Sequence, residues 1–188
     1  FTNKAAKEMK DRLYLLVGSD ASKLQVSTFH SFGLKLLREN YETLGYDKNF
    51  VIMDSDDSLT VVKKILKDMD LDPKIYNPRA IRNKISSCKN EMMSPKAYER
   101  YAISDYEKIV QQVYEKYETK LQRNNSVDFD DLLLKPVELF KKRKDIFWRF
   151  ASSDIFKTEC LQKADCMSVD DLETKMYQLN IRILITMF

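Results

Sequence analysis

Glycine and proline are scarce in this sequence of 188 residues, which contains only three and four of them. Folds built from many hairpins and turns need more of both, so the shortage favours a helix-rich fold. No apolar run reaches the ~20 residues that a membrane-spanning helix requires, and we expect no membrane partner. The apolar share of 44% is nevertheless large enough to build a hydrophobic core, which excludes wholesale disorder.

Disulfide, metal and catalytic chemistry also lack their usual residues. Three cysteines and one histidine form neither an even disulfide framework nor the common ligand set of a zinc site. Cys160 and Cys166 are too far apart for a CxxC motif, so we expect reduced cysteines in a cytoplasmic protein. The acidic run Asp128–Asp131 resembles a metal site only superficially, because an N-cap followed by first-turn carboxylates explains it better. We therefore expect no metal site and no catalytic residues in the chain.

The sequence also has no glycine-rich loop for phosphate groups and no strong excess of one charge. Neither GxxxxGK[ST] nor GxGxxG occurs, and three dispersed glycines cannot build such a loop. Lysine and arginine number 32 against 29 acidic residues, a net charge of +3. A balance this small does not by itself predict a nucleic-acid partner.

Capping residues and apolar spacing predict the elements of the first 45 residues. Thr2 and Asn3 precede a helical pattern that ends at Gly18. Residues 24–28 alternate like a short strand, and a second helix is expected from about His30 to Leu44. The order helix, strand, helix is typical of an α/β layer.

Residues 46–125 give a different pattern, with helix starts and no strand signal. The expected starts are at Asp54 or Ser55, Asn77-Pro78, Ser94-Pro95 and Ser104. Asp128 is expected to cap a further helix that is kinked at Pro136. Near the end of the chain, we expect a helix from Ser168 to about Leu179 and a strand at Ile181–Phe188.

Three short segments resemble the UvrD/PcrA-type superfamily 1 DNA helicases when they are taken together and in order. They are FTNKAAKEM at residues 1–9, STFHSF at residues 27–32 and NSVDFDDL at residues 125–132. The stretches NFVIMD and CKNE between them add to the resemblance, which extends from Phe1 to about Phe140. Residues 149–188 do not match the family pattern.

The resemblance implies a domain organisation. Residues 1–45 correspond to part of the first RecA-like motor domain, called 1A, and residues 46–125 to the helical subdomain 1B. Residues 126–148 correspond to a helix that returns toward 1A. The expected fold is therefore mainly α, a helical bundle with a remnant of a RecA-like α/β motor domain.

The resemblance also implies DNA-binding residues. Single-stranded DNA would contact Phe1 by stacking on a base, and would contact hydrogen-bonding side chains at Thr2, Asn3, Thr28, His30 and Ser31. Thr2 and Asn3 are equally suited to capping alone, and Phe29 and Phe32 are expected in the core. A basic stretch could face duplex phosphates or simply be a solvated helix face; it consists of Arg79, Arg82, Lys84 and Lys89.

As a function, the resemblance implies the DNA-binding portion of an ATP-dependent 3′–5′ helicase, acting on single-stranded and forked DNA in repair or replication. ATP and magnesium would belong to the parent protein, because the phosphate loop would precede Phe1 and the acidic pair would follow Phe140. The 188 residues alone should then hold no cofactor and hydrolyse no ATP. The alternative is a helical protein-interaction module without motor activity. The exposed strands at 24–28 and 181–188 also suggest self-association.

Overall fold

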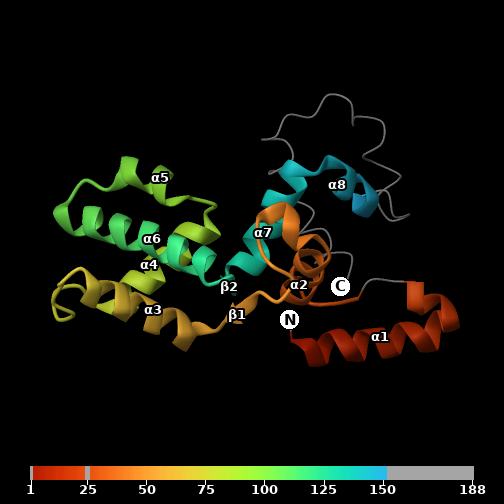
Figure 1. The fold of residues 1–188 in the computed structure, drawn as a ribbon. Coiled ribbons are helices and arrows are strands. Elements are labelled where there is room, and N and C mark those ends of the chain that lie inside the picture. The colour runs from red at the N-terminus through yellow and green to blue at the C-terminus, as the bar shows by residue number, and fades with distance from the viewer. Residues whose placement is uncertain (1, 24–25, 152–188) are drawn as a thin grey trace. The chain divides into compact units, whose positions relative to one another are not determined.

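The computed structural model describes residues 2–23 and 26–151, and it is mostly helical (Figure 1). The chain divides into two compact units, residues 1–136 and residues 137–188, which are described separately here. The mainly α class expected from the sequence is confirmed. Among the described residues, no helix is both long and apolar enough to cross a membrane.

The first helix, α1 (Asn3–Val17), begins and ends where its capping residues predict. The Thr2 side chain accepts a hydrogen bond from the Ala5 N–H at 3.2 Å, which satisfies one of the unpaired donors of the first turn. Gly18 follows with φ 62°, a backbone conformation that residues with a Cβ atom rarely adopt. A 3₁₀ turn, η1 (Gly18–Lys23), comes next.

The second helix, α2 (Phe29–Asn40), is capped by the Thr28 side chain, which accepts from the Ser31 N–H at 3.2 Å. It continues into η2 (Tyr41–Leu44) and ends at Gly45, which has φ 76°. The strand expected just before α2 is not seen at residues 26–28, which have no regular structure. Residues 24 and 25, the other part of that expected strand, lie outside the described residues.

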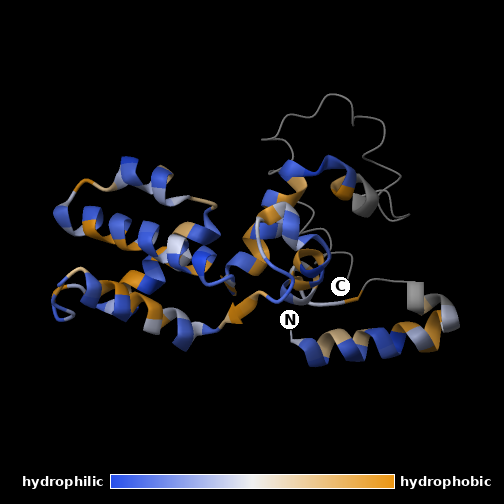
Figure 2. Ribbon diagram, in the orientation of Figure 1, coloured by the Kyte–Doolittle hydropathy of each residue, from blue (hydrophilic) through white to orange (hydrophobic). Residues whose placement is uncertain are grey.

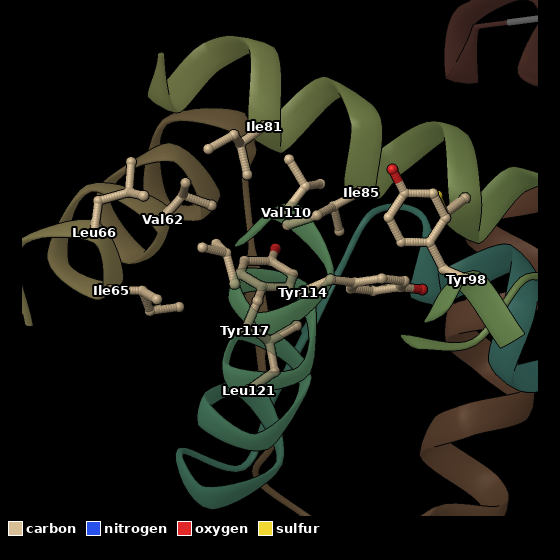
Figure 3. Packing of buried hydrophobic residues seen from close by; sticks show 12 residues of the cluster. Val62, Ile65, Leu66, Ile81, Ile85, Tyr98, Val110, Tyr114, Tyr117 and Leu121 are labelled. Carbon is tan, nitrogen blue, oxygen red and sulfur yellow. The ribbon is translucent and has the colours of Figure 1, made fainter. Parts of the chain in front are cut away.

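The central helices pack into a bundle, and their starts agree with the capping residues in the sequence. The bundle contains α3 (Ser55–Asp68), α4 (Pro78–Asn90), α5 (Pro95–Tyr98), η3 (Glu99–Tyr101) and α6 (Asp105–Arg123). Reciprocal capping boxes join Asp54 to Asp57 and Ser104 to Glu107. Figure 3 shows the apolar core, which contains Val62, Leu66, Ile81, Ile85, Val110, Tyr114 and Leu121 among other buried residues.

A short strand at residues 51–53 corrects the expectation that residues 46–125 are entirely helical. Strand β1 (Val51–Met53) pairs in parallel with β2 (Ser126–Asp128), and Ile52 lies opposite Val127. Three residues are too few to show an alternating pattern. All the helices of the bundle lie between the two strands in the sequence, so no local signal predicts the pairing.

The chain then forms α7 (Asp131–Lys142), which contains Pro136, and α8 (Lys144–Ala151). Asp128 accepts a hydrogen bond from the Asp131 N–H at 2.8 Å, which agrees with its expected capping role. The helix expected at residues 168–179 and the strand expected at residues 181–188 lie outside the described residues. Self-association through strands therefore stays a prediction.

Helix α2 and the start of α7 touch backbone to backbone at Gly33. A Cβ atom on Gly33 would collide with the carbonyl oxygen of Leu132, and it would lie 3.3 Å from Cγ of Pro136. Because a backbone carbonyl cannot swing aside as a side chain can, glycine is the residue that permits this close approach.

Replacing Gly33 with alanine should lower the free energy of unfolding by about 1–3 kcal/mol, the usual cost of overpacking. The sign is informative, because the same change in an open helix position stabilises by about 0.5–1 kcal/mol. Urea unfolding followed by circular dichroism measures the difference. Glu39→Ala, at an exposed position of α2, is the control and should change stability by less than about 0.5 kcal/mol. A stabilised Gly33→Ala protein would contradict the packing described.

Candidate nucleic-acid interface

The N-terminal ends of α1 and α2 are joined by a small network of polar side chains. Ser31 Oγ donates to Asn3 Oδ1 at 3.2 Å, and Thr28 Oγ1 lies 2.9 Å from Ser31 Oγ and 3.3 Å from Asn3 Oδ1. Asn3 belongs to the first turn of α1, whereas Thr28 and Ser31 belong to the start of α2. Asn3 therefore shares one site with two residues that lie 25 and 28 positions later in the sequence.

The electrostatics of this site favour an anion. The N-terminal end of a helix carries N–H groups without intrahelical partners and a partial positive charge. Acidic side chains often occupy such positions, but neither α1 nor α2 has one in its first turn. Asn3 and Ser31 are exposed, so their polar groups are accessible to a phosphate.

An aromatic pair adds a different kind of contact. The exposed His30 ring lies edge-on to Phe129, with 6.2 Å between the ring centroids and an interplanar angle of 89°. Phe129 lies in the turn before α7 and is 45% exposed. An exposed ring can stack on a nucleic-acid base. No local pattern predicts this pairing, because Phe129 and His30 are distant along the chain.

The other residues expected at the single-stranded DNA site have simpler positions. Thr2 is exposed and caps α1, and Phe1 lies outside the described residues. Phe29 and Phe32, which were expected in the core rather than at this site, are half-buried. The DNA-binding role of Phe1 and Thr2 is still a prediction, whereas the capping role of Thr2 is present in the structure.

The four basic residues expected on one face of α4 do not share one environment. Arg79 is exposed, and Arg82 donates to Ser55 Oγ at 3.1 Å. The Lys84 ammonium lies 5.3 Å from the centroid of the Tyr98 ring. Lys89 departs from the expected basic face, because its side chain is fully buried and cannot reach duplex phosphates.

Lys89 instead forms the centre of a buried ionic cluster. Its ammonium lies 2.8 Å from Asp128 Oδ2, 2.8 Å from Glu118 Oε1 and 3.1 Å from Asp131 Oδ1. Tyr117 donates its hydroxyl proton to Asp128 Oδ2 at 2.9 Å. The cluster joins α4 and α6 of the bundle to β2 and the first residue of α7.

The protonation equilibria reflect this crowding. Burial alone would lower the pKa of Lys89, but the charges of Asp131, Glu118 and Asp128 outweigh it and raise the pKa well above its ordinary value. Burial raises the pKa of Asp131 to about 7, against the opposing charge of Lys89. Asp128 is buried too, yet Lys89 and the hydrogen bonds that Asp128 accepts hold its pKa below the ordinary value. Lys89 is therefore a permanent cation on which the ionised carboxylates depend.

Comparison with known proteins identifies similar sequences. The family model described as UvrD/REP helicase N-terminal domain matches residues 1–171. The ATP-dependent DNA helicase PcrA of Bacillus subtilis (strain 168) is 42% identical over 146 residues, which cover 78% of this chain and 20% of that protein. The PcrA of Leuconostoc citreum is 39% identical over 151 residues, 80% of this chain and 20% of that protein. The chain spans about a fifth of the length of these curated relatives.

Replacing Lys89 with methionine should lower the free energy of unfolding at pH 7 by about 3–5 kcal/mol, because the buried carboxylates lose their counter-charge. Without that charge the pKa of Asp128 rises above its unfolded value and the already raised pKa of Asp131 rises further. Their penalty is therefore absent below the unfolded-state pKa values and grows as the pH rises from there to the folded-state pKa values. The deficit should therefore shrink at pH 5. Urea unfolding at both pH values tests this.

Lys84→Met is the matched control on the same helix, since Lys84 is exposed and touches one aromatic ring. It should cost less than about 1 kcal/mol at either pH. Equal losses of unfolding free energy in the two variants would show that the buried carboxylates do not need the charge of Lys89.

Proposed function

Because the chain belongs to the family of the UvrD/REP helicase N-terminal domain, we propose that it is the DNA-binding portion of an ATP-dependent DNA helicase. The proposed partner is single-stranded DNA, bound by the ends of α1 and α2 and by the turn before α7. The whole helicase translocates in the 3′–5′ direction and unwinds forked duplex in repair or replication. The proposed location is the cytoplasm.

The observation that supports this function best is the convergence of Asn3, Thr28 and Ser31 beside an exposed aromatic pair. A helicase must hold DNA of any sequence, so it needs phosphate contacts and base stacking rather than recognition of base edges. The polar network provides hydrogen-bonding groups for a phosphate, and the rings of His30 and Phe129 provide a surface for a base. Both lie in the unit formed by residues 1–136.

The proposed domain organisation follows the family. Residues 1–45 belong to part of motor domain 1A, and residues 46–125 form subdomain 1B. Residues 126–148, which contain β2, α7 and part of α8, return toward 1A. Duplex DNA ahead of the fork would contact Arg79, Arg82 and Lys84, without Lys89. ATP and magnesium would bind elsewhere in the full helicase, because this sequence has no glycine-rich phosphate loop.

A second candidate function, a protein-interaction module, is favoured by one observation. The end of α1 exposes a run of apolar side chains, Tyr14, Leu15, Leu16 and Val17, and Figure 2 shows the hydrophobic colour there. Exposed apolar side chains that adjoin one another are typical of surfaces that another protein covers. A module of this kind would bind a protein and have no affinity for DNA.

Ser31→Ala and His30→Ala should each weaken binding to single-stranded DNA, by about tenfold where a hydrogen bond to a charged phosphate is lost. Fluorescence anisotropy with a labelled oligonucleotide measures the affinity, and the wild-type affinity should fall as salt concentration rises. Ser87→Ala is the matched control, since Ser87 is an exposed serine on α4. It should leave the affinity unchanged. A wild-type chain that binds a protein partner but no DNA at any salt concentration would favour the interaction module.

The purified 188-residue chain should not hydrolyse ATP, with or without DNA and magnesium. Phosphoryl transfer requires a cradle for the phosphates and carboxylates for the metal ion, and the expected loop and acidic pair are not in this sequence. Phosphate release, compared with a mock purification, is the measurement. DNA-stimulated ATP hydrolysis above that background would contradict the proposal that ATP binds elsewhere in the full helicase.

A further inference from the structure

The buried ionic cluster connects the helical bundle to the turn that carries Phe129. Lys89 is on α4, and Glu118 is on α6 of the same bundle. The other two carboxylates flank the turn between β2 and α7: Asp128 is the last residue of β2, and Asp131 is the first residue of α7. One ammonium therefore joins the bundle to both ends of a four-residue segment.

That segment is held in one conformation by its own hydrogen bonds. The Asp131 N–H donates to Asp128 Oδ1 at 2.8 Å, and the Asp128 N–H donates to Asp131 Oδ2 at 3.3 Å. A further contact, 3.4 Å from Asn90 Nδ2 to Asp130 Oδ1, joins the same turn to α4. The turn thus behaves as a small rigid body whose position depends on its attachment to the bundle.

The turn also contacts α2, which carries part of the proposed DNA-binding site, at two points. Phe129 lies edge-on to His30 at the start of α2. The carbonyl group of Leu132, the residue after the turn, lies directly against Gly33 of the same helix. A displacement of the turn would move the Phe129 ring relative to His30 and to the polar network around Ser31.

We propose that Lys89 is a positioning residue for the single-stranded DNA face: by binding Asp128 and Asp131 it fixes the turn that holds Phe129 beside His30. The DNA part of this inference rests on the proposed function. Lys89 acts through the turn and does not touch DNA, because its side chain is fully buried.

An ionic attachment suits this role better than an apolar one. An ammonium group has three N–H donors, and here three carboxylates lie within 3.1 Å of it. Apolar side chains tolerate sliding and repacking, whereas a buried charge left without its partner is costly. The cluster therefore specifies one position for the turn, even where an apolar core would be equally stable.

The test compares two substitutions, each of which neutralises one carboxylate that contacts Lys89. Asp128→Asn removes a carboxylate that belongs to the turn, and Glu118→Gln removes one that belongs to the bundle. Both lower the negative charge around Lys89 by one, so the comparison isolates the attachment to the turn. Urea unfolding establishes that each variant is folded. If Asp128→Asn does not fold, Asp131→Asn takes its place in the same comparison.

His30 provides a direct readout, because it is the only histidine in the sequence. Its imidazole signals in a ¹H–¹³C NMR spectrum of the untagged chain report the ring of Phe129 nearby. Phe129→Ala gives the reference position of these signals without that ring. In Asp128→Asn the signals should move toward the reference, and in Glu118→Gln they should stay at the wild-type position.

The affinity for single-stranded DNA is the second readout. Asp128→Asn should weaken binding about five- to tenfold, since a base–aromatic stack is worth about 1–3 kcal/mol, and Glu118→Gln should stay within about twofold of wild type. Failure of the wild-type chain to bind DNA would sink the proposed function, while the NMR comparison would still decide the positioning role. Unchanged His30 signals in a folded Asp128→Asn protein would overturn that role, and so would equal changes in both variants.

Discussion

A single buried ammonium group is the constraint on which the arrangement of the first unit depends. Lys89 has no contact with solvent, and three carboxylates from different segments converge on it. Each carboxylate would be costly to bury alone, so the segments that carry them must meet at one point. The bundle, the strand pair and the start of α7 are thereby fixed relative to one another.

Local signals predicted most of the helices, and the reason is that capping is a local interaction. Asp54, Asn77 and Ser104 each accept hydrogen bonds from the N–H groups two or three residues later, so a few consecutive letters contain the whole interaction. Glycine ends α1 for the same reason. The pair β1–β2 could not be predicted in this way, because each strand is defined only by a partner that is distant in sequence.

The candidate site was predictable in its composition but not in its geometry. The family resemblance selected Asn3, Thr28, His30 and Ser31, and the structure brings three of them into one hydrogen-bonded network. It did not select Phe129, whose exposure depends on a turn rather than on helical periodicity. Lys89 is the opposite case. The other basic residues of α4, Arg79, Arg82 and Lys84, are exposed or half-buried, and only the three-dimensional arrangement shows that the charge of Lys89 is used internally.

The parallel pairing of β1 and β2 determines how the bundle is attached. Parallel neighbours cannot be joined by a tight turn, and here the entire helical bundle is the crossover between them. The backbone enters and leaves the bundle through adjacent strands, so two paired strands connect the bundle to the preceding and following segments. A single flexible linker would let it rotate freely, whereas two covalent connections side by side resist twisting. The strand pair thus opposes rotation of the bundle, and any other insertion joined to the same two strands would have to supply a counter-charge for Asp128 and Asp131.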